Sequence, residues 1–347
     1  MHLKLCYFLL FSFVLLLLPA IVPAADEPGT EQRVSKEKIA IFDFENLSGA
    51  EDVLTHVMPA VTGLMKSKGF DLQDEESLND FLIKERVRTT GYISRELALK
   101  MEKELNVTAV LLGTIYTFSM GSNPQLGLSA RLVDSSTGEI LWSEYASATG
   151  DDFTSLLGLG TLHSMEELLP VVMDRVFASF SIEPPLKVSE ETYRIAVMPF
   201  LNKTELKERG MIPSYMFIAE LFKNSHYVPV EFGEVRSAIV KTRIRDRGEV
   251  DYRSIAGISE SLNVDGILVG AVELYSDGRE TGSAPAVVIS ARLIDARKNR
   301  ILWCDSHQMN GDEDVSILDF GKIRSVDKVA YKVISQLIKK MEKTEWK

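Results

Sequence analysis

The sequence contains one hairpin motif twice, and this duplication constrains the fold more than any other feature. Residues 130–143 read ARLVDSSTGEILWS, and residues 291–304 read ARLIDARKNRILWC. In each copy two apolar-rich stretches flank a short polar turn, which is the pattern of two antiparallel strands. A supersecondary unit that recurs along one chain indicates a tandem duplication, so we expect two similarly folded halves.

The elements around the hairpin recur in the same order. Residues 38–44 correspond to residues 194–200, and residues 70–107 align with residues 227–264 without a gap. Gly113 recurs as Gly270, after which the second copy is four residues longer around residues 276–283. A loop is where such an insertion is expected.

Hydrophobic periodicity and capping residues predict the elements of the first copy. Strands are expected at residues 38–44, 70–72, 109–115, 125–133 and 139–147, and helices at residues 54–65, 77–83, 95–105 and 165–180, the third capped by Ser94. The last helix of the second copy is expected at residues 326–341. Each closing helix should place its apolar stripe on the sheet of its own copy, with contact between the two copies or with a partner helix as the alternative. Each copy then reads β-α-β-α-α-β-β-β-α, an α/β (α+β) fold in which helices pack on a mixed sheet.

The amino terminus has the three parts of a secretory signal peptide. Lys4 precedes a nearly continuous apolar run over residues 5–18, and small residues end at Ala24. The run is shorter than the roughly 20 residues of a membrane-spanning helix, so we expect cleavage after Ala24 rather than an uncleaved anchor. Cys6 precedes the apolar run, which places it too early to be a lipid-modified cysteine at a cleavage site.

The remaining boundaries follow from composition. We predict a signal peptide at residues 1–24, a flexible lead-in at 25–37, a first domain at 38–180, a linker at 181–193 and a second domain at 194–343. The linker carries Pro184 and Pro185 beside a charge cluster, which is typical of a domain boundary. The processed chain has about 320 residues, enough for two ordinary cores.

The charge of the chain argues against nucleic acid as a partner. Residues 1–24 contain Lys4 and no acidic residue, so cleavage changes 39 basic residues to 38 against 50 acidic ones, and the formal net charge from −11 to −12. Binding to phosphates needs a concentrated positive face. Cys304 is then the one cysteine left, so no internal disulfide is expected, and its place beside Trp303 in a strand predicts a small buried apolar group rather than a reactive thiol.

The sequence resembles the CsgG family and the amino-terminal domain of TolB. The resemblance rests on the opening residues 39–44 with Asn46 behind them, the helix at 78–86, the strand at 109–114 and the hairpin at 132–142. The second copy keeps Leu293 to Asp295 and Ile301 to Trp303 but has lost the Thr-Gly-Glu of the turn. The resemblance implies a TolB-N/anticodon-binding-like fold. It also implies envelope work without catalysis, such as secretion pores, periplasmic partner binding, or flagellar and cell-wall accessory roles.

The pore-forming activity of CsgG is not expected here. CsgG is acylated and extends its loops into membrane-spanning hairpins, whose strands need about 9–11 residues each. The loops at residues 118–125, 151–161 and 276–284 are too short and too polar for that, and no acylated cysteine is present. We expect a pore-less relative without a membrane span after signal cleavage.

Residue patterns for catalysis, a metal or a cofactor are missing from the sequence. His56, His163, His226 and His307 are scattered without metal-ligand spacing. The glycine-rich stretch at residues 158–160 has no nucleophile, and no phosphate loop is recognisable. We therefore predict a protein that is not an enzyme and holds no cofactor; an enzyme would need a cleft in which dispersed titratable groups converge.

Clusters of basic residues are the candidate partner-binding sites. Each copy has a basic corner after its second helix, and the second hairpin has a basic turn in place of an acidic one; the candidate residues are Lys84, Arg86, Arg88, Lys241, Arg243, Arg245, Lys298 and Arg300. A docking patch for an acidic partner is one interpretation, and a solvated helix end is the other. Asn299 should still allow the turn, so the fold is kept while the surface charge reverses.

Two further features have structural explanations. Trp142 and Trp303 end matching strands and are expected to pack in the core, with a partner-binding anchor as the alternative. Asn46 and Asn202 are expected to hydrogen-bond to backbone at a strand-end turn rather than to carry glycans.

Together these features predict a non-enzymatic periplasmic adaptor or assembly factor of the bacterial envelope, with a link to secretion or outer-membrane assembly and a place at the periphery of the outer membrane as an option. Envelope proteins or further copies of the chain are the expected partners, and nucleic acid is not. The alternative is a periplasmic sensor that binds a small ligand or glycan in a cleft between the two repeats.

Overall fold

The computed structural model describes residues 37–154, 160–183, 191–204, 210–242, 252–278, 282–313 and 322–346. The predicted signal peptide at residues 1–24 and nearly all of the lead-in lie outside the described residues. Residues 37–347 group into one compact unit.

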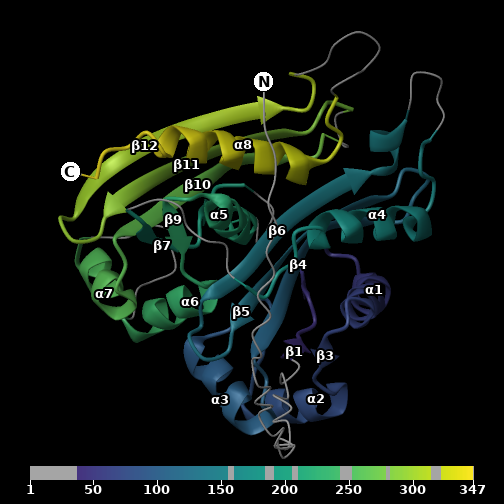
Figure 1. The fold of residues 1–347 in the computed structure, drawn as a ribbon. Helices are drawn as coiled ribbons and strands as arrows, with labels where there is room; N and C mark the ends of the chain where they lie inside the picture. The colour runs from purple at the N-terminus through teal and green to yellow at the C-terminus, as the bar shows by residue number, and fades with distance from the viewer. Residues whose placement is uncertain are drawn as a thin grey trace, which may run out of the picture. The chain divides into compact units, whose positions relative to one another are not determined.

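The first repeat contains a six-stranded mixed sheet (Figure 1). Its strands are β1 (Lys38–Ile41), β2 (Glu45–Asn46), β3 (Asp71–Leu72), β4 (Ala109–Ser119), β5 (Gln125–Asp134) and β6 (Ile140–Thr149). The order is β3-β1-β4-β5-β6, with β2 beside β4. The pairs of β1 with β3 and β4 are parallel, whereas β4, β5 and β6 form an antiparallel meander.

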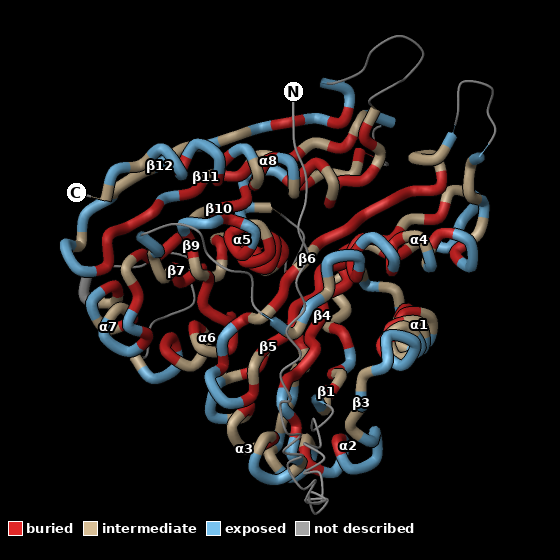
Figure 2. The backbone as a smooth tube through the Cα atoms, in the orientation of Figure 1, coloured by how far each residue is buried: buried red, intermediate tan, exposed pale blue. Residues whose placement is uncertain are grey.

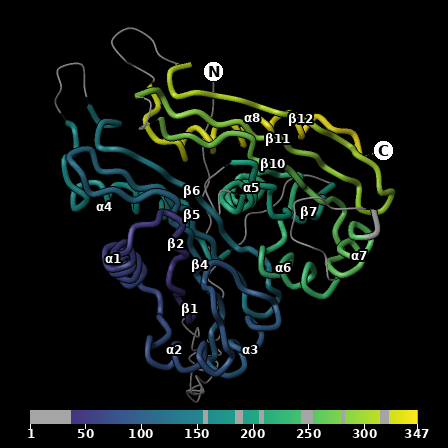
Figure 3. The backbone as a smooth tube through the Cα atoms, turned by 180° about the vertical axis from the view of Figure 1, so that it is seen from behind, coloured from purple at the N-terminus to yellow at the C-terminus, as the bar shows by residue number. Residues whose placement is uncertain are grey.

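Helices cover both faces of this sheet. They are α1 (Val53–Ser67), α2 (Glu75–Lys84), α3 (Arg95–Leu105) and α4 (Met165–Phe177), with a short 3-10 turn η1 (Gly150–Phe153) before α4. Side chains of α1 and α4 share one hydrophobic cluster with the sheet, and side chains of α2 and α3 join a different cluster on the other face. Figure 3 shows α1 and α4 on the side that faces away from the second repeat.

The second repeat has the same topology. Its strands are β7 (Tyr193–Val197), β8 (Leu201–Asn202), β9 (Tyr227–Pro229), β10 (Gly266–Ser276), β11 (Ala286–Asp295) and β12 (Arg300–Asn310), in the order β12-β11-β10-β7-β9 with β8 beside β10. Its helices are α5 (Met211–Lys223), α6 (Phe232–Lys241), α7 (Tyr252–Leu262) and α8 (Val326–Met341). The predicted fold class is confirmed.

The correspondence between the repeats extends to single residues. Helices α2 and α6 begin at Glu75 and Phe232, as the ungapped alignment requires, and the residues after α3 and α7 are asparagines with positive φ, 56° at Asn106 and 48° at Asn263. A Cβ at Gly113 would overlap the ring of Phe44, and the same holds for Gly270 and Phe200. The repeated glycine therefore lets an aromatic ring lie directly on the strand.

Some predicted boundaries were too long. The first strand ends at Ile41 rather than at residue 44, and α4 ends at Phe177 rather than at residue 180. The additional residues of the second copy fall between β10 and β11, as predicted. Asn46 accepts a hydrogen bond from the Ser48 amide at 3.0 Å, and Asn202 accepts one from the Thr204 amide at 3.0 Å, which confirms their predicted role.

Both hairpin turns use a residue in the left-handed region. Gly138 has φ 73° and Asn299 has φ 54°, so Asn299 does make the turn that glycine makes in the first copy. The carboxylate of Asp134 accepts the Ser136 and Thr137 amides at 2.9 and 2.7 Å. Asp295 does the same for the second hairpin. In each hairpin, the carboxylate of the aspartate before the turn therefore accepts hydrogen bonds from two backbone amides of the turn that have no partner in the strand ladder.

Replacing Asp134 with alanine is expected to lower the free energy of unfolding by about 1 kcal/mol at neutral pH, the usual cost of losing such a cap. Partial burial raises the pKa of Asp134, but the hydrogen bonds from Ser136 and Thr137 outweigh it, and the pKa lies below its usual value. The stabilisation is therefore complete above the unfolded pKa and is lost as the pH falls through the folded one.

The measurement is urea denaturation of both proteins from pH 7 downward. The difference between wild type and Asp134→Ala should narrow below about pH 4. Asp80→Asn, at an exposed position of α2, serves as the control and should change the free energy of unfolding at pH 7 by less than about 0.5 kcal/mol. A difference that stays constant over this range would contradict the assigned role of the carboxylate.

Candidate functional site

The two repeats meet through helix α5, which is apolar on all sides. Its residues Ile212 to Ala219 are all buried, as are Leu221 and Phe222 (Figure 2). A helix that is hydrophobic all round must be covered on every side. It packs on its own repeat through α8 and β9, and on β5 and β6 of the first repeat.

One hydrophobic cluster consequently runs through both repeats. The sheet face that carries α2 and α3 in the first repeat receives the face that carries α5 and α8 in the second. Different surfaces of two similar units are in contact, so the arrangement is head-to-tail rather than two-fold symmetric. The predicted domain boundaries at residues 38–180 and 194–343 stay predictions.

A buried ion pair lies at the centre of this contact. Arg131 on β5 donates from Nε to Oε2 of Glu231 at 2.6 Å and from Nη2 to Oε1 at 2.8 Å, and their side chains are 3% and 0% exposed. Arg131 Nη2 also donates to the carbonyl of Gly91 at 2.6 Å, and its guanidinium lies 5.1 Å from the ring centroid of Tyr215. Burial lowers the pKa of Arg131, but Glu231 outweighs it and raises the pKa above its usual value.

The position of Glu231 explains why it is free to make this pair. It is the N-cap residue of α6, yet its side chain makes no capping hydrogen bond. Its Oε1 instead accepts the amide of Ile93 at 3.3 Å. A helix cap has therefore been converted into a contact with the other repeat.

Charged and aromatic contacts surround the buried pair. Glu139 in the first hairpin turn pairs with Arg194 at 3.0 Å, and Asp152 pairs with Lys328 at 3.2 Å. The rings of Tyr145 and Tyr331 stack with centroids 4.1 Å apart. These contacts extend the junction along the length of β6.

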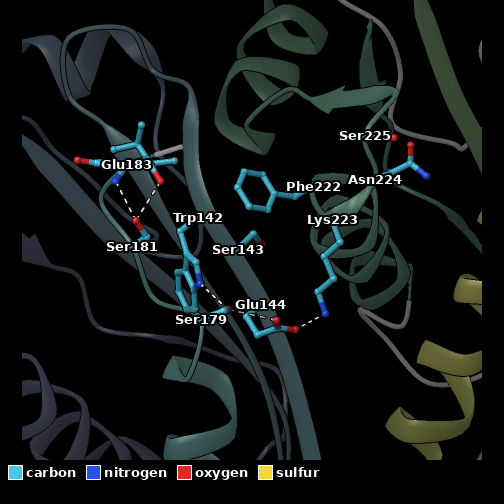
Figure 4. A pocket seen from close by; sticks show the side chains of 11 residues that line it. Trp142, Ser143, Glu144, Ser179, Ser181, Glu183, Phe222, Lys223, Asn224 and Ser225 are labelled. Atoms are coloured by element: carbon cyan, nitrogen blue, oxygen red, sulfur yellow. Dashed lines mark hydrogen bonds and ion pairs between the residues drawn. The ribbon is translucent and has the colours of Figure 1, made fainter. Parts of the chain in front are cut away.

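A cavity of 450 Å³ opens between the repeats (Figure 4). One wall is Trp142, Ser143 and Glu144 of β6, and the other comes from the end of α5; the lining residues there are Phe222, Lys223, Asn224 and Ser225. Glu144 and Lys223 form an ion pair across it. The cavity therefore combines an apolar floor with a fixed pair of opposite charges.

Trp142 belongs to the core, as predicted. It is 3% exposed, stacks on Phe177 with centroids 5.4 Å apart, and donates from Nε1 to Ser179 Oγ at 3.1 Å. Trp303 is half-buried and packs against the cluster that the repeats share.

The prediction that Cys304 is buried was wrong. Its side chain is exposed, because strand alternation turns Trp303 toward the core and its neighbour toward the opposite face of β12. Ser306 and Gln308 are exposed on the same face. The counterparts of these residues on β6, Ser143, Tyr145 and Ser147, are buried by the second repeat.

The predicted basic residues lie at the surface and form separate groups. Lys84 at the end of α2 is exposed and pairs with Glu104 at 2.5 Å, and Arg86 and Arg88 follow it. Lys241 ends α6, whereas Arg243 and Arg245 lie outside the described residues. Lys298 and Arg300 are exposed in the second hairpin turn, with Arg300 Nε 3.9 Å from Asp295.

Sequence reasoning missed Arg131 and Glu231, although Arg131 lies within the repeated hairpin. An arginine between apolar residues of a buried strand is itself a signal, because such a charge needs a partner. Among the described residues, no group of three or more His, Cys, Asp or Glu side chains could hold a metal ion. Within the same residues, no helix combines the length and hydropathy that crossing a membrane requires.

Comparisons with known proteins give distant structural likenesses. No protein-family model and no curated protein sequence matches the chain. Among solved structures the chain is similar to the PelC dodecamer from Paraburkholderia phytofirmans, at 18% identity and a TM-score of 0.29 over 42% of this chain and 86% of that one. It is also similar to lipoprotein GNA1162 from Neisseria meningitidis, at 17% identity and a TM-score of 0.30 over 41% of this chain and 99% of that one.

TolB from Acinetobacter baumannii is a third structure with such a likeness, at 12% identity and a TM-score of 0.24, over 43% of this chain and 29% of that one. TolB is one of the two proteins that the sequence resembles, and none of these three structures is a CsgG protein. Each alignment covers less than half of the present chain.

Proposed function

We propose that the protein is a non-enzymatic periplasmic adaptor or assembly factor of the bacterial envelope, linked to secretion or outer-membrane assembly. The observation that carries the proposal is the divergence of the two hairpin turns. Glu139 in the first turn pairs with Arg194 of the second repeat, whereas Lys298 and Arg300 occupy the second turn and are exposed. The hairpin turn of the first repeat thus contributes to the internal junction, whereas the hairpin turn of the second repeat presents basic charge at the surface.

The predicted signal peptide supports export to the periplasm, and the acidic net charge of −11 makes a local basic surface distinctive. Envelope proteins with an acidic surface are the expected partners, because opposite potentials steer association and fix its register.

Reversing both charges with Lys298→Glu and Arg300→Glu is expected to reduce partner recovery at least about tenfold, since close charge pairs at an interface are worth more than about 1.4 kcal/mol. The measurement is recovery of crosslinked partners from intact envelopes, quantified against wild type.

Lys68→Glu with Lys103→Glu is the matched control, because these exposed lysines lie on the first repeat and give the same change in net charge. Its recovery should equal that of wild type. If the wild-type protein recovers no specific partner, the adaptor function itself is contradicted. If both variants recover the partner equally, the second hairpin turn is not the partner-binding site.

The second candidate function is a sensor for a small ligand or glycan. It is favoured by the 450 Å³ cavity between the repeats, with Phe222 and the Glu144–Lys223 pair in its walls. A ligand that binds only the folded state raises the melting temperature. Thermal-shift screening of sugars and small metabolites should then find a compound that raises the melting temperature, and a screen without one would argue for the adaptor.

A further inference from the structure

A second cavity, of 480 Å³, lies in the first repeat between α1, β3 and the start of α2, elements that can be followed in Figure 1. Its lining includes Asp43, Met58, Lys66, Gln73, Asp74 and Glu75. No described residue of the second repeat lines it.

The cavity occupies the position in the first repeat that corresponds to the site on the second repeat where Arg131 binds. Asp74 and Glu231 are the N-cap residues of the corresponding helices α2 and α6. Continuing the ungapped alignment back through the preceding helix pairs Met58 with Tyr215. Both residues of the second repeat that hold the guanidinium, Glu231 and Tyr215, thus have their counterparts in the lining of the cavity.

The lining has the acceptors that a guanidinium needs. Asp74 lines the cavity, and its Oδ2 accepts the Ser77 amide at 2.9 Å and the Ser77 hydroxyl at 3.0 Å. Asp43 and Glu75 add negative charge, against the single positive charge of Lys66. The buried Oε1 of Gln73 accepts no hydrogen bond from the described residues. Arginine, with its planar set of five N–H donors, matches such an arrangement better than lysine does.

We propose that this cavity binds an arginine side chain of a partner protein, in the way that the second repeat binds Arg131. The proposal rests on the adaptor function and names one of its contacts. The carboxylate of Asp74 takes the role of Glu231, and Met58 takes the place of Tyr215 beside the guanidinium.

The arginine does not come from a second copy of this chain. Repeating the internal junction between two copies would bring Arg292, the counterpart of Arg131, to the cavity. At such a contact between copies, each ion pair of the internal junction would be replaced by the corresponding residues of the other repeat. The Glu139–Arg194 pair would become Arg300 against Lys38, and the Asp152–Lys328 pair would become Glu313 against Glu167. Two attractive contacts thus become repulsive, and like charges in contact suppress a wrong partner.

The test is a titration of the protein, labelled with ¹³C at its methionine methyl groups, with arginine amide and with lysine amide. The Met58 methyl resonance should shift saturably as arginine amide is added. The same resonance should show that lysine amide binds several-fold more weakly. Asp74→Asn should weaken the binding of arginine amide about tenfold, because the guanidinium loses a hydrogen bond to a charged carboxylate. Asparagine still caps α2, so the fold is kept. Asp80→Asn, an exposed position on the same helix, is the matched control and should bind as wild type does.

Equal binding of lysine amide, an equal loss in Asp80→Asn, or no saturable shift would overturn the proposal. The proposal would also be overturned if the protein self-associates in sedimentation experiments and Arg292→Gln abolishes this self-association, since the arginine would then come from a second copy. Crosslinking separates this test from that of the adaptor function. If arginine amide binds and no partner is recovered, the adaptor function fails and the cavity stands; if a partner is recovered equally with Asp74→Asn, the cavity fails and the adaptor function stands.

Discussion

Glu231→Ala is expected to lower the free energy of unfolding by about 3–5 kcal/mol, the cost of breaking a buried ion pair from one side. The variant leaves the charge of Arg131 inside the junction, where the side chain is 3% exposed, and removes the acceptor of the Ile93 amide. Urea denaturation at pH 7 measures the loss, and native-state hydrogen exchange at the Ile93 amide should show faster opening of the junction.

Glu234→Ala is the comparison for this variant. Glu234 accepts the Arg95 amide at 2.6 Å across the same junction, but that hydrogen bond is exposed, so its loss should cost about 1 kcal/mol. Arg131→Met combined with Glu231→Leu should be far less harmful than Glu231→Ala, because no unpaired charge stays buried. A cost below about 1 kcal/mol for Glu231→Ala would show that Arg131 finds solvent or another partner.

Gly233→Ala is expected to be the second damaging substitution, with a loss of about 1–3 kcal/mol or more from overpacking. Gly233 is in the first turn of α6, where alanine would ordinarily favour the helix. A Cβ at this position would overlap the carbonyl oxygen of Ile93 in the first repeat, and backbone there cannot move aside as a flexible side chain could. Urea denaturation measures the loss, and hydrogen exchange at Ile93 and Arg95 locates it at the junction.

The matched control is Glu76→Ala, at the corresponding position of α2 in the first repeat. Glu76 is exposed, so the substitution should change the free energy of unfolding by less than about 0.5 kcal/mol. If Gly233→Ala were equally harmless, the two repeats would not approach each other as closely as α6 and Ile93 do here.

The repeated elements could be predicted because their signals are local. Ser94 caps α3 through the Leu97 amide, and a positive-φ asparagine ends both α3 and α7, so boundaries follow from neighbouring residues. The hairpin turns were predictable for the same reason, since an aspartate and a residue that tolerates positive φ suffice to form them.

The junction could not be predicted in this way, because its partners are far apart in the chain. Arg131 and Glu231 are separated by 100 positions, and duplication gives no rule for how two copies pack. One signal was present: α5 is apolar on every side, whereas its counterpart α1 buries only Val53, Val57, Val61 and Met65. Cys304 was mispredicted because the burial of its first-repeat counterpart, Ser143, depends on that same junction.

The packing of α8 on β6 also has a consequence for the order in which the chain can complete its fold. A chain synthesised from its amino terminus presents the first sheet well before residues 326–341 exist. Until then Tyr145 lacks the ring of Tyr331 and Ser147 lacks the hydroxyl of Ser325, although their own repeat is fully synthesised. The face of β6 that carries Tyr145 and Ser147 is therefore completed only when the last helix arrives, and shortening the carboxyl terminus uncovers a strand of the half that was made first.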